Sequence, residues 1–309
     1  MQLLAGSALV AIPTETVYGL AGNALDARAV AQIFKVKERP TFDPLIVHTS
    51  GLDRIPDFVE SIPEKAYALA AAFWPGPLTM VFRKKAIIPD LVTSGMDSVA
   101  VRIPRHPLSL QLLQSLDFPL AAPSANPFGY VSPTCARHVD EQLGEKIPYI
   151  LDGGSCTVGI ESTIVGFDGD KVSVLRLGGC KIEDMEKVVG KVQIKAHTSS
   201  NPVVPGMLHS HYSPLTPVTI GNIPQLIREH QGKKLGILSF DQLYDDIPLA
   251  QQFVLSKKGD LDEAATSLFT GLRQLDMLNL QLIIGTYVKE KGLGRAINDR
   301  LRRAEAKRN

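Results

Sequence analysis

The chain has 309 residues, 44% of them hydrophobic, and a formal net charge of +1 at pH 7. This length predicts two domains, and this composition excludes an intrinsically disordered chain. A net charge so close to zero also excludes a polycation that binds nucleic acid over its whole surface, so any anion site must be a local cluster of cations.

The cysteines and the first residues exclude further classes of protein. Cys135, Cys156 and Cys180 form no C-x-x-C pair, which argues against a zinc knuckle or a disulfide framework and predicts a reducing, cytoplasmic location. The apolar opening has no basic leader and meets a proline after 12 residues, which is too early for a membrane span. We expect the end of a helix there, a turn at Gly6-Ser7 and then a strand, and no contact with a membrane.

In chain order, short β-rich runs alternate with amphipathic helical stretches through the first two thirds of the chain. Helices are predicted at about 26–37, with Asp26 as the N-cap, and at 63–73, 107–115, 133–142 and 181–189. Strands are predicted at 8–13, 45–49, 78–83, 99–104, 149–154, 162–168 and 172–178. This alternation predicts one domain over residues 1–194, of the α/β or α+β class and built on one large sheet.

Residues 195–217 interrupt the alternation with four prolines and a Ser/Asn cluster, which predicts a linker without regular structure. They include His209-x-His211, a pair without a third ligand that we do not interpret as a metal site. Residues 218–309 then predict a small α/β domain with a parallel sheet. Its strands are expected at 218–221, 234–240, 253–256 and 281–287, and its helices at 223–231, at about 260–276 and in the basic C-terminal stretch.

Polar residues gather where the predicted strands end, which is where open α/β sheets usually bind ligands. In "PTETVYGLAGNA" (13–24), Thr14, Glu15 and Thr16 follow a buried strand, and two glycines permit tight turns. A plain turn whose hydroxyls cap the next helix explains this stretch equally well, so the motif alone is not specific.

The stretch "KVKERPTFDPLIVH" (35–48) places Lys37 and Arg39 just before an apolar run. Cations at the C-terminal end of a helix can cap its carbonyls, which is the simplest explanation. The two cations are two residues apart, however, so they do not share a helix face, and Pro40 ends the helix. A point charge beside a bidentate guanidinium is also what a polyphosphate needs.

Three further stretches leave similar alternatives open. Arg102 lies inside a strand, where it either faces solvent or reaches into a cleft to bind a carboxylate. Ser124 and Asn126 flank one alanine after a small-residue strand, which suits a plain turn or a ligand. The glycines of 152–167 bring backbone close to another group, and Arg176 follows on the next strand.

The sequence lacks the known phosphate and catalytic motifs. It contains no G-x-x-x-x-G-K-[ST], no G-x-G-x-x-G, no G-x-S-x-G and no H-E-x-x-H. A nucleotide site in this chain must therefore be built without them.

Together these stretches resemble one family, the YrdC-domain threonylcarbamoyl-AMP synthases, in their longer two-domain form. The matching pieces are "PTETVYGL", "KVKERPTFDPLIVH", "WPGPLT", "VAVRIPRHP", "APSAN", "SPT", "DGG…GIESTIV" and "LRLGG", in the family's order over about residues 8–190. The linker "PGMLHSHYSP" and the small second domain match the long form as well. The resemblance implies a large twisted mixed sheet around a basic cavity, followed by a small Rossmann-like α/β domain.

The resemblance also implies an activity. Members of the family make threonylcarbamoyl-AMP and pyrophosphate from L-threonine, bicarbonate and ATP, which makes them nucleotidyltransferases. Their product passes to a tRNA-modifying complex that forms threonylcarbamoyladenosine. Mg²⁺ is expected with the ATP, held by phosphate oxygens and water without a protein ligand.

The site residues that the resemblance implies come from distant parts of the chain. Lys37, Arg39, Ser124 and Asn126 correspond to the family's catalytic K-x-R…S-x-N tetrad, with the two cations on the phosphates. The positions that correspond to ATP contacts are Arg39, Asp43, Ser98, Ser124, Ser132 and Arg176, with Tyr212 closing over the nucleotide. The positions that correspond to threonine contacts are Thr16, His48, Arg102, Ala122 and Ser162, with Arg102 on the carboxylate. Asp43 stands where many members carry Asn, and an acid there needs a nearby cation.

Two alternatives stay open at this point. Another carbamoyl-adenylate-forming enzyme of the same fold, as in hydrogenase maturation proteins, would also carry acylphosphatase and zinc-finger domains. An RNA-binding module without catalysis would use the basic cavity, with weak, salt-sensitive binding helped by the C-terminal helix. The cations of that helix are Arg295, Arg300, Arg302, Arg303, Lys307 and Arg308, and a solvated helix face explains them more simply.

Overall fold

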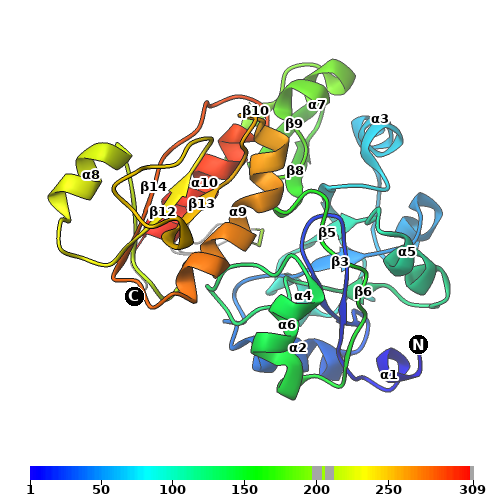
Figure 1. The fold of residues 1–309 in the computed structure, drawn as a ribbon. Helices are drawn as coiled ribbons and strands as arrows, with labels where there is room; N and C mark the ends of the chain where they lie inside the picture. Colours follow the sequence, from blue (N-terminus) through cyan, green and yellow to red (C-terminus); the bar gives the residue numbers. More distant parts are fainter. Residues whose placement is uncertain (197–203, 206–211, 307–309) are drawn as a thin grey trace.

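The computed structural model of the protein describes residues 1–196, 204–205 and 212–306 and contains two sheets (Figure 1). The strands of the larger sheet are β1 Val10–Ile12, β2 Gly19–Asn23, β3 Ile46–His48, β4 Leu78–Arg83, β5 Ser98–Arg102, β6 Leu120–Ala121, β7 Tyr149–Ile150, β8 Thr163–Asp168, β9 Lys171–Arg176 and β10 Gln193–Ile194. Their order across the sheet is β10-β9-β8-β4-β5-β3-β6-β2-β1-β7. Strand β4 pairs antiparallel with β5 and parallel with β8, so the sheet is mixed, as expected.

The helices predicted in this part lie within about three residues of the expected positions, and α4 is an additional one. They are α1 Gln2–Ala5, α2 Ala27–Lys37, α3 Glu64–Phe73, α4 Asp90–Thr93, α5 Pro107–Gln114, α6 Ala136–Leu143 and α7 Ile182–Val189, with short 3-10 turns at Leu52–Asp57 and Gly144–Lys146. Asp26 caps α2 as predicted, since its side chain accepts a hydrogen bond from the backbone of Arg28.

The two faces of the large sheet differ because side chains alternate along each strand. On β5, Val99 and Val101 belong to the main apolar core, together with Val47 of β3 and Leu78 of β4. The alternate positions face the other way, and one of them carries Arg102. One face of the sheet is therefore used for helix packing, and the other carries Arg102 beside a small apolar cluster that contains Ile46 and Ala100.

One expectation about the first strands is wrong. Gly19 and Gly22, expected to permit tight turns after the first strand, lie in strand β2, which pairs antiparallel with β1. The glycines fit a crowded strand instead of a turn: a Cβ on Gly22 would lie 2.9 Å from Leu9 Cδ2, and a Cβ on Gly19 would lie 3.2 Å from Ala122 Cβ. Small residues are needed there because neighbouring elements approach the backbone closely.

The second sheet is small and parallel, as predicted. Its strands are β11 Val218–Ile220, β12 Leu235–Ser239, β13 Gln252–Val254 and β14 Leu282–Gly285, in the order β11-β14-β12-β13. Every pairing between them is parallel. The helices of this part are α8 Ile223–Glu229, α9 Leu261–Asp276 and α10 Gly294–Glu305, with a 3-10 turn at Leu249–Gln251.

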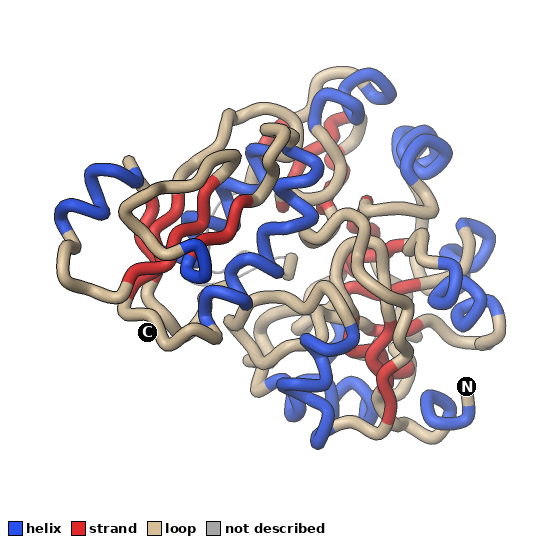
Figure 2. Tube along the Cα trace, viewed as in Figure 1, coloured by secondary structure: helices blue, strands red, loops and turns tan. Residues whose placement is uncertain are grey.

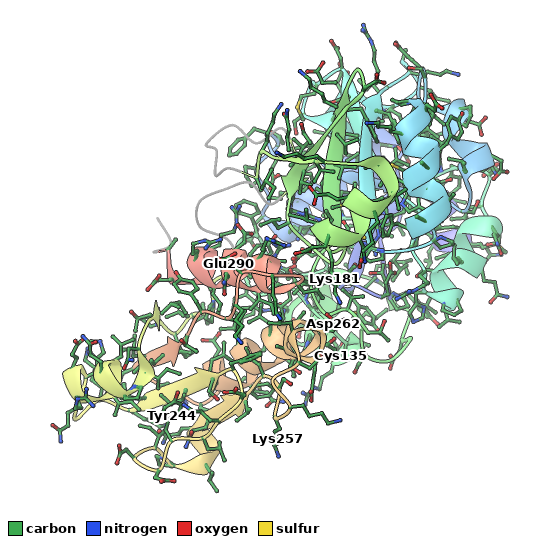
Figure 3. All side chains as sticks on the ribbon, turned by 90° about the horizontal axis from the view of Figure 1, so that it is seen from above. Cys135, Lys181, Tyr244, Lys257, Asp262 and Glu290 are labelled. Atoms are coloured by element: carbon green, nitrogen blue, oxygen red, sulfur yellow. The ribbon has the colours of Figure 1, made fainter. Side chains whose placement is uncertain are left out.

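Helices α9 and α10 join the two parts. Figure 2 shows α9 between the small sheet and the loops of the larger part. One apolar cluster contains Val131 and Ile160 of the larger part together with Phe269 and Leu272 of α9. Polar contacts extend this interface, including the ion pair of 2.8 Å between Lys181 Nζ and Asp262 Oδ2, both labelled in Figure 3.

Two further findings concern the surface. The C-terminal helix was expected to be solvated, but Arg300 and Arg303 of α10 are buried, with 0% and 4% of their surfaces exposed. They lie inside because α10 packs toward the larger part and against α9. Among the described residues, none of the helices has the length and apolar character that crossing a membrane requires.

Candidate active site

Nine of the fourteen residues expected to form the site line one cavity on the face of the large sheet that carries Arg102. The space not filled by atoms in and around the cavity is about 550 Å³, a volume that includes open solvent. All the positions expected to bind threonine line it, namely Thr16, His48, Arg102, Ala122 and Ser162. Four of the positions expected to bind ATP line it as well, namely Arg39, Ser124, Arg176 and Tyr212.

Arg102 lies at the end of β5 and is 4% exposed, so of the two alternatives for this arginine the solvated one is excluded. Its Nη2 forms an ion pair of 2.7 Å with Glu15 Oε1, and its Nη1 donates to Thr16 Oγ1 at 2.8 Å. Its Nε donates to the carbonyl of Gly76 at 3.1 Å. Burial opposes ionisation of Glu15, but Arg102 and a backbone N–H hold the pKa of Glu15 below its usual value.

His48 and Ser162 line the cavity with neutral polar groups. Burial, with a smaller effect of the Arg102 charge, lowers the pKa of His48 to about 3, so the imidazole is neutral at pH 7. The Ser162 hydroxyl lies 2.7 Å from that of Thr79 on the neighbouring strand β4. Ala122 contributes backbone and shape, and its N–H donates to the carbonyl of Ile46 at 3.0 Å.

Arg176, the last residue of β9, is the third arginine on the cavity wall. Its Nε and Nη2 donate to the carbonyl of Ser162 at 3.1 and 2.9 Å, and Nη2 also reaches the Ser162 hydroxyl at 3.0 Å. Its Nη1 donates to the carbonyl of Pro205 in the linker at 3.0 Å. Burial lowers the pKa of Arg176 to about 10, which still leaves the guanidinium charged at pH 7.

Arg39 lines the cavity with its positive charge already paired. Its Nη2 lies 2.9 Å from Asp43 Oδ2, and Nε and Nη2 donate to the carbonyls of Asp43 and Pro44 at 3.0 and 2.8 Å. Asp43 is 0% exposed and does not line the cavity. Burial raises the pKa of Asp43, whereas Arg39 and Lys37 act in the opposite direction. The acid therefore has the nearby cation that its position requires.

Lys37 lies behind the cavity wall. It is the last residue of α2, only 1% of its surface is exposed, and its Nζ donates to the carbonyls of Ser124 and Asn126 at 2.6 Å each. Asn126 also lies outside the cavity lining, and its Nδ2 donates to the carbonyls of Pro127 and Tyr130 at 2.9 Å each. The tetrad is thus one connected unit, in which Lys37 and Asn126 fix the loop that presents Ser124. A contact of Lys37 with phosphate stays a prediction.

Three positions remain. Ser132 is buried next to the cavity and donates to Glu161 Oε1 at 2.6 Å. Ser98 begins β5 and lines a different hollow on the same sheet face, about 13 Å along the strand from Arg102. Tyr212 is 1% exposed and stacks on Phe269 of α9, with ring centroids 5.5 Å apart. The structure brings Ser132 and Tyr212 to the cavity and leaves Ser98 outside it.

Two acids of the site were not among the site residues assigned from the sequence. Glu161 lines the cavity, and Glu15 lies behind it as the partner of Arg102. Both stand beside residues that were predicted, in "TET" and "EST". The signal that could have found them is an acid next to two hydroxyl residues at a strand end, in a chain whose arginines were also expected at the site.

The described residues contain no group of three or more His, Cys, Asp or Glu side chains placed to hold a metal ion. The pair His209-x-His211 lies outside the described residues. Both acids closest to the cavity arginines, Glu15 and Asp43, are held in ion pairs.

Comparison with known proteins now identifies the family. A family model described as "Telomere recombination" matches residues 2–178, and one described as "Threonylcarbamoyl-AMP synthase, C-terminal domain" matches residues 180–306. The threonylcarbamoyl-AMP synthase of Pyrococcus abyssi is 40% identical over 97% of this chain and 91% of its own length. That of Bacillus subtilis is 37% identical over 98% of this chain and 90% of its own length.

The fold agrees with these sequence relatives. The crystal structure of P. abyssi Sua5 complexed with L-threonine has a TM-score of 0.91 to this structure and 39% identity, and the match covers 98% of this chain and 92% of the other. An α/β protein with a mixed sheet, a polar cavity and a small parallel domain is therefore the class observed. The chain belongs to the threonylcarbamoyl-AMP synthase family.

Proposed function

We propose that the chain is an enzyme that makes threonylcarbamoyl-AMP and pyrophosphate from L-threonine, bicarbonate and ATP. The observation that carries this proposal is the cavity, where side chains from several separate segments meet in a chain that resembles named synthases along nearly its whole length. A site with three arginines and several hydroxyl groups suits two anionic substrates held together.

The amino acid fits the end of the cavity around Arg102. Its carboxylate would lie on the Arg102 guanidinium, and Thr16 and Ser162 would offer hydroxyl groups beside it. His48 is neutral and adds no positive charge that would repel the substrate ammonium. These roles rest on the position of each side chain at the cavity wall.

The phosphates fit the end around Arg176 and Arg39. Both guanidinium groups face the cavity, and the loop held by Lys37 presents Ser124 beside them. Ser132 and Asn126 support this region from behind, while the ATP contact of Ser98 requires the nucleotide to extend along β5. Asp43 acts through Arg39 and not on the nucleotide, because it is fully buried in that ion pair.

The chemistry needs placement more than a protein nucleophile. The threonine amine attacks bicarbonate with loss of water, or CO2 with loss of one proton, and either reaction gives a carbamate. A carbamate oxygen then attacks the α-phosphorus of ATP, and pyrophosphate departs with its bonding electron pair. Holding three substrates in contact supplies several kcal/mol through effective molarity. Fixed cations stabilise the charge that develops on the phosphates.

Mg²⁺ would enter as part of the substrate MgATP, held by phosphate oxygens and water. Binding of Mg²⁺ without a protein ligand agrees with the state of the acids in the site, because Glu15, Asp43 and Glu161 each form an ion pair with an arginine. The magnesium supplies charge neutralisation on the phosphates, and the residues of the chain hold and orient the nucleotide around it.

The linker would cover the bound substrates. Pro205 and Tyr212 line the cavity, and Val204 packs in an apolar cluster with Ile46 and Ala100 on the same sheet face. A cover of this kind would exclude water and protect the mixed anhydride from hydrolysis.

The product would pass to a tRNA-modifying complex in the cytoplasm, where the three free cysteines of the described chain stay reduced. The non-catalytic RNA-binding module is the weaker candidate. Two of the cations expected to face RNA, Arg300 and Arg303, are buried instead. Any direct RNA contact would use the remaining exposed cations and would be weak and sensitive to salt.

The test is pyrophosphate release from MgATP and bicarbonate with L-threonine, with L-serine and without amino acid, together with mass detection of threonylcarbamoyl-AMP. We expect release that depends on threonine, with the product in equal amount. Release that is the same without amino acid, or no product mass, would refute the proposal. RNA that binds tightly at physiological salt while no adenylate forms would favour the RNA-binding module.

A further inference from the structure

The second domain contributes a buried arginine to the edge of the cavity. Arg300 of α10 is 0% exposed, and its Nε lies 3.0 Å from Oε2 of Glu161, which lines the cavity. Its Nη1 donates to the carbonyl of Leu177 at 2.7 Å and to Asp299 Oδ2 at 2.9 Å. The guanidinium also lies over the ring of Tyr212, 5.1 Å from its centroid. The helix therefore reaches the cavity wall through one side chain.

The arginines of the cavity differ in what neutralises them. Arg39 pairs with Asp43, and Arg102 pairs with Glu15. Arg176 forms no ion pair with an acid in the described part of the chain, and its donors reach Ser162 and Pro205 instead. The anion site consequently has one cation whose charge is not balanced by its own acid.

An acid adjoins the residue that Arg176 holds. Glu161 precedes Ser162, the residue that Arg176 holds, and the charge of Glu161 acts on Arg176. Its carboxylate is turned to other partners, with Arg300 on Oε2 and the Ser132 hydroxyl on Oε1 at 2.6 Å. If a buried carboxylate loses its arginine partner, pairing with another nearby cation becomes favourable, because an uncompensated buried charge is costly.

We propose that α10 sets the charge of the phosphate end of the cavity: Arg300 holds Glu161 away from Arg176, so that Arg176 stays available for an anionic group of the nucleotide. Arg300 is in this sense a positioning residue of the second domain, and Glu161 is the acid on which it acts. This rests on the proposed function, and it gives the small parallel domain a part in nucleotide binding without any contact between that domain and the substrate.

The test compares four proteins for MgATP affinity by calorimetry and for KM and kcat by pyrophosphate release. They are the wild type, Arg300→Met, Glu161→Gln and the double variant. Arg300→Met removes the charge but keeps an apolar chain of similar length, so we expect the affinity for MgATP to fall at least tenfold and KM to rise, with less effect on kcat. In the double variant no carboxylate is left to capture Arg176, so we expect affinity at least fivefold tighter than that of Arg300→Met.

Two further variants separate charge from packing. Arg302→Met is the matched control, because Arg302 lies on the same helix but is half exposed and pairs with Glu290. Arg300→Lys restores a cation opposite Glu161, and we expect it to recover most of the affinity that Arg300→Met loses. Melting temperatures of all variants report any general loss of folding.

The outcomes are distinct. A double variant that binds MgATP as weakly as Arg300→Met would overturn the proposal, because a purely structural role of Arg300 predicts no rescue by removing an acid. Arg300→Met that binds as tightly as Arg302→Met would overturn it too. If the wild type releases no pyrophosphate with threonine and binds no MgATP, the proposed function fails and this proposal fails with it.

Discussion

Lys37 offers the sharpest test of how the site is built. Its ammonium lies behind the cavity wall and donates to the carbonyls of Ser124 and Asn126 at 2.6 Å each. Substitution Lys37→Met keeps the length of the side chain but removes the charge and both hydrogen bonds. The backbone bond from the N–H of Phe128 to the carbonyl of residue 37, 2.8 Å in this structure, survives the change. The perturbation is therefore confined to two carbonyls of the loop that presents Ser124.

The expected cost follows from those two bonds. A hydrogen bond from a charged donor contributes about 1.5–3 kcal/mol, so the pair contributes about 3–6 kcal/mol. Part of that gain is offset, because burial lowers the pKa of Lys37 well below its usual value and so disfavours the ammonium that makes the bonds. We expect the free energy of unfolding to fall by about 2–4 kcal/mol, which leaves a domain of ordinary stability folded.

Activity should fall further than stability. A shift of about 1 Å in a positioned group can cost roughly a hundredfold in rate, so displacement of Ser124 should lower kcat/KM for adenylate formation at least tenfold. Urea denaturation measures the free energy of unfolding, and pyrophosphate release measures kcat/KM. Lys35→Met is the control, because Lys35 is exposed two residues earlier on the same helix. If Lys37→Met is as stable as Lys35→Met, or turns over as fast, the structural role of Lys37 is refuted.

Three further predictions concern other parts of the cavity. The buried His48 has a pKa of about 3, below its ordinary value of 6.5, so it stabilises the fold above pH 6.5 and this contribution is lost as the pH falls toward 3. Between pH 6.5 and 4.5 this histidine costs the wild type about 2–3 kcal/mol of unfolding free energy, at about 1.36 kcal/mol per pH unit. The variant His48→Asn lacks the titrating group, so its unfolding free energy should fall by that much less over the same range. Equal pH slopes of unfolding free energy in the two proteins would contradict this. The variant Arg102→Lys has one ammonium group and cannot bond Glu15 and Thr16 as the guanidinium does. We therefore expect KM for L-threonine to rise at least tenfold, with KM for ATP changed much less. A proportional rise of both KM values would argue against a carboxylate contact. Val204→Asp puts a charge into the apolar cluster under the linker, so the yield of threonylcarbamoyl-AMP per pyrophosphate released should fall at least twofold, and an unchanged yield would refute the cover.

Local sequence signals predicted the elements of the fold well. The alternation of apolar and polar residues placed β4 at Leu78–Arg83 as expected, and Asp26 marked the start of α2 through the capping that its side chain performs. The parallel small sheet followed from strands that alternate with helices. These features depend on neighbours within a few residues, so they can be predicted from short stretches of sequence.

Features that depend on distant contacts were missed. Strand β2 looked like a glycine turn because its need for small residues comes from Leu9 and from Ala122, about a hundred residues further along the chain. Arg300 looked like part of a solvated helix face because its partner Glu161 is 139 residues away. The family resemblance located the cavity residues, but it did not say which acid neutralises which arginine. That pairing decides where positive charge remains, and only the assembled structure contains it.

The cations of the site also hold backbone carbonyls, and this affects how any substitution of them should be interpreted. Each donates to backbone carbonyls, and all of them except Lys37 also pair with an acid or line the cavity. The bonds to carbonyls are Lys37 with Ser124 and Asn126, Arg39 with Asp43 and Pro44, Arg102 with Gly76, Arg176 with Ser162 and Pro205, and Arg300 with Leu177. Buried carbonyls need partners, so these side chains hold the walls of the cavity in shape while they supply its charge. Replacing one of them by alanine therefore removes a ligand contact and loosens a loop at once. Removing the opposing acid changes the charge and leaves the carbonyl contacts in place, which is why variants of Glu15, Asp43 and Glu161 separate electrostatics from shape more cleanly than variants of the arginines do.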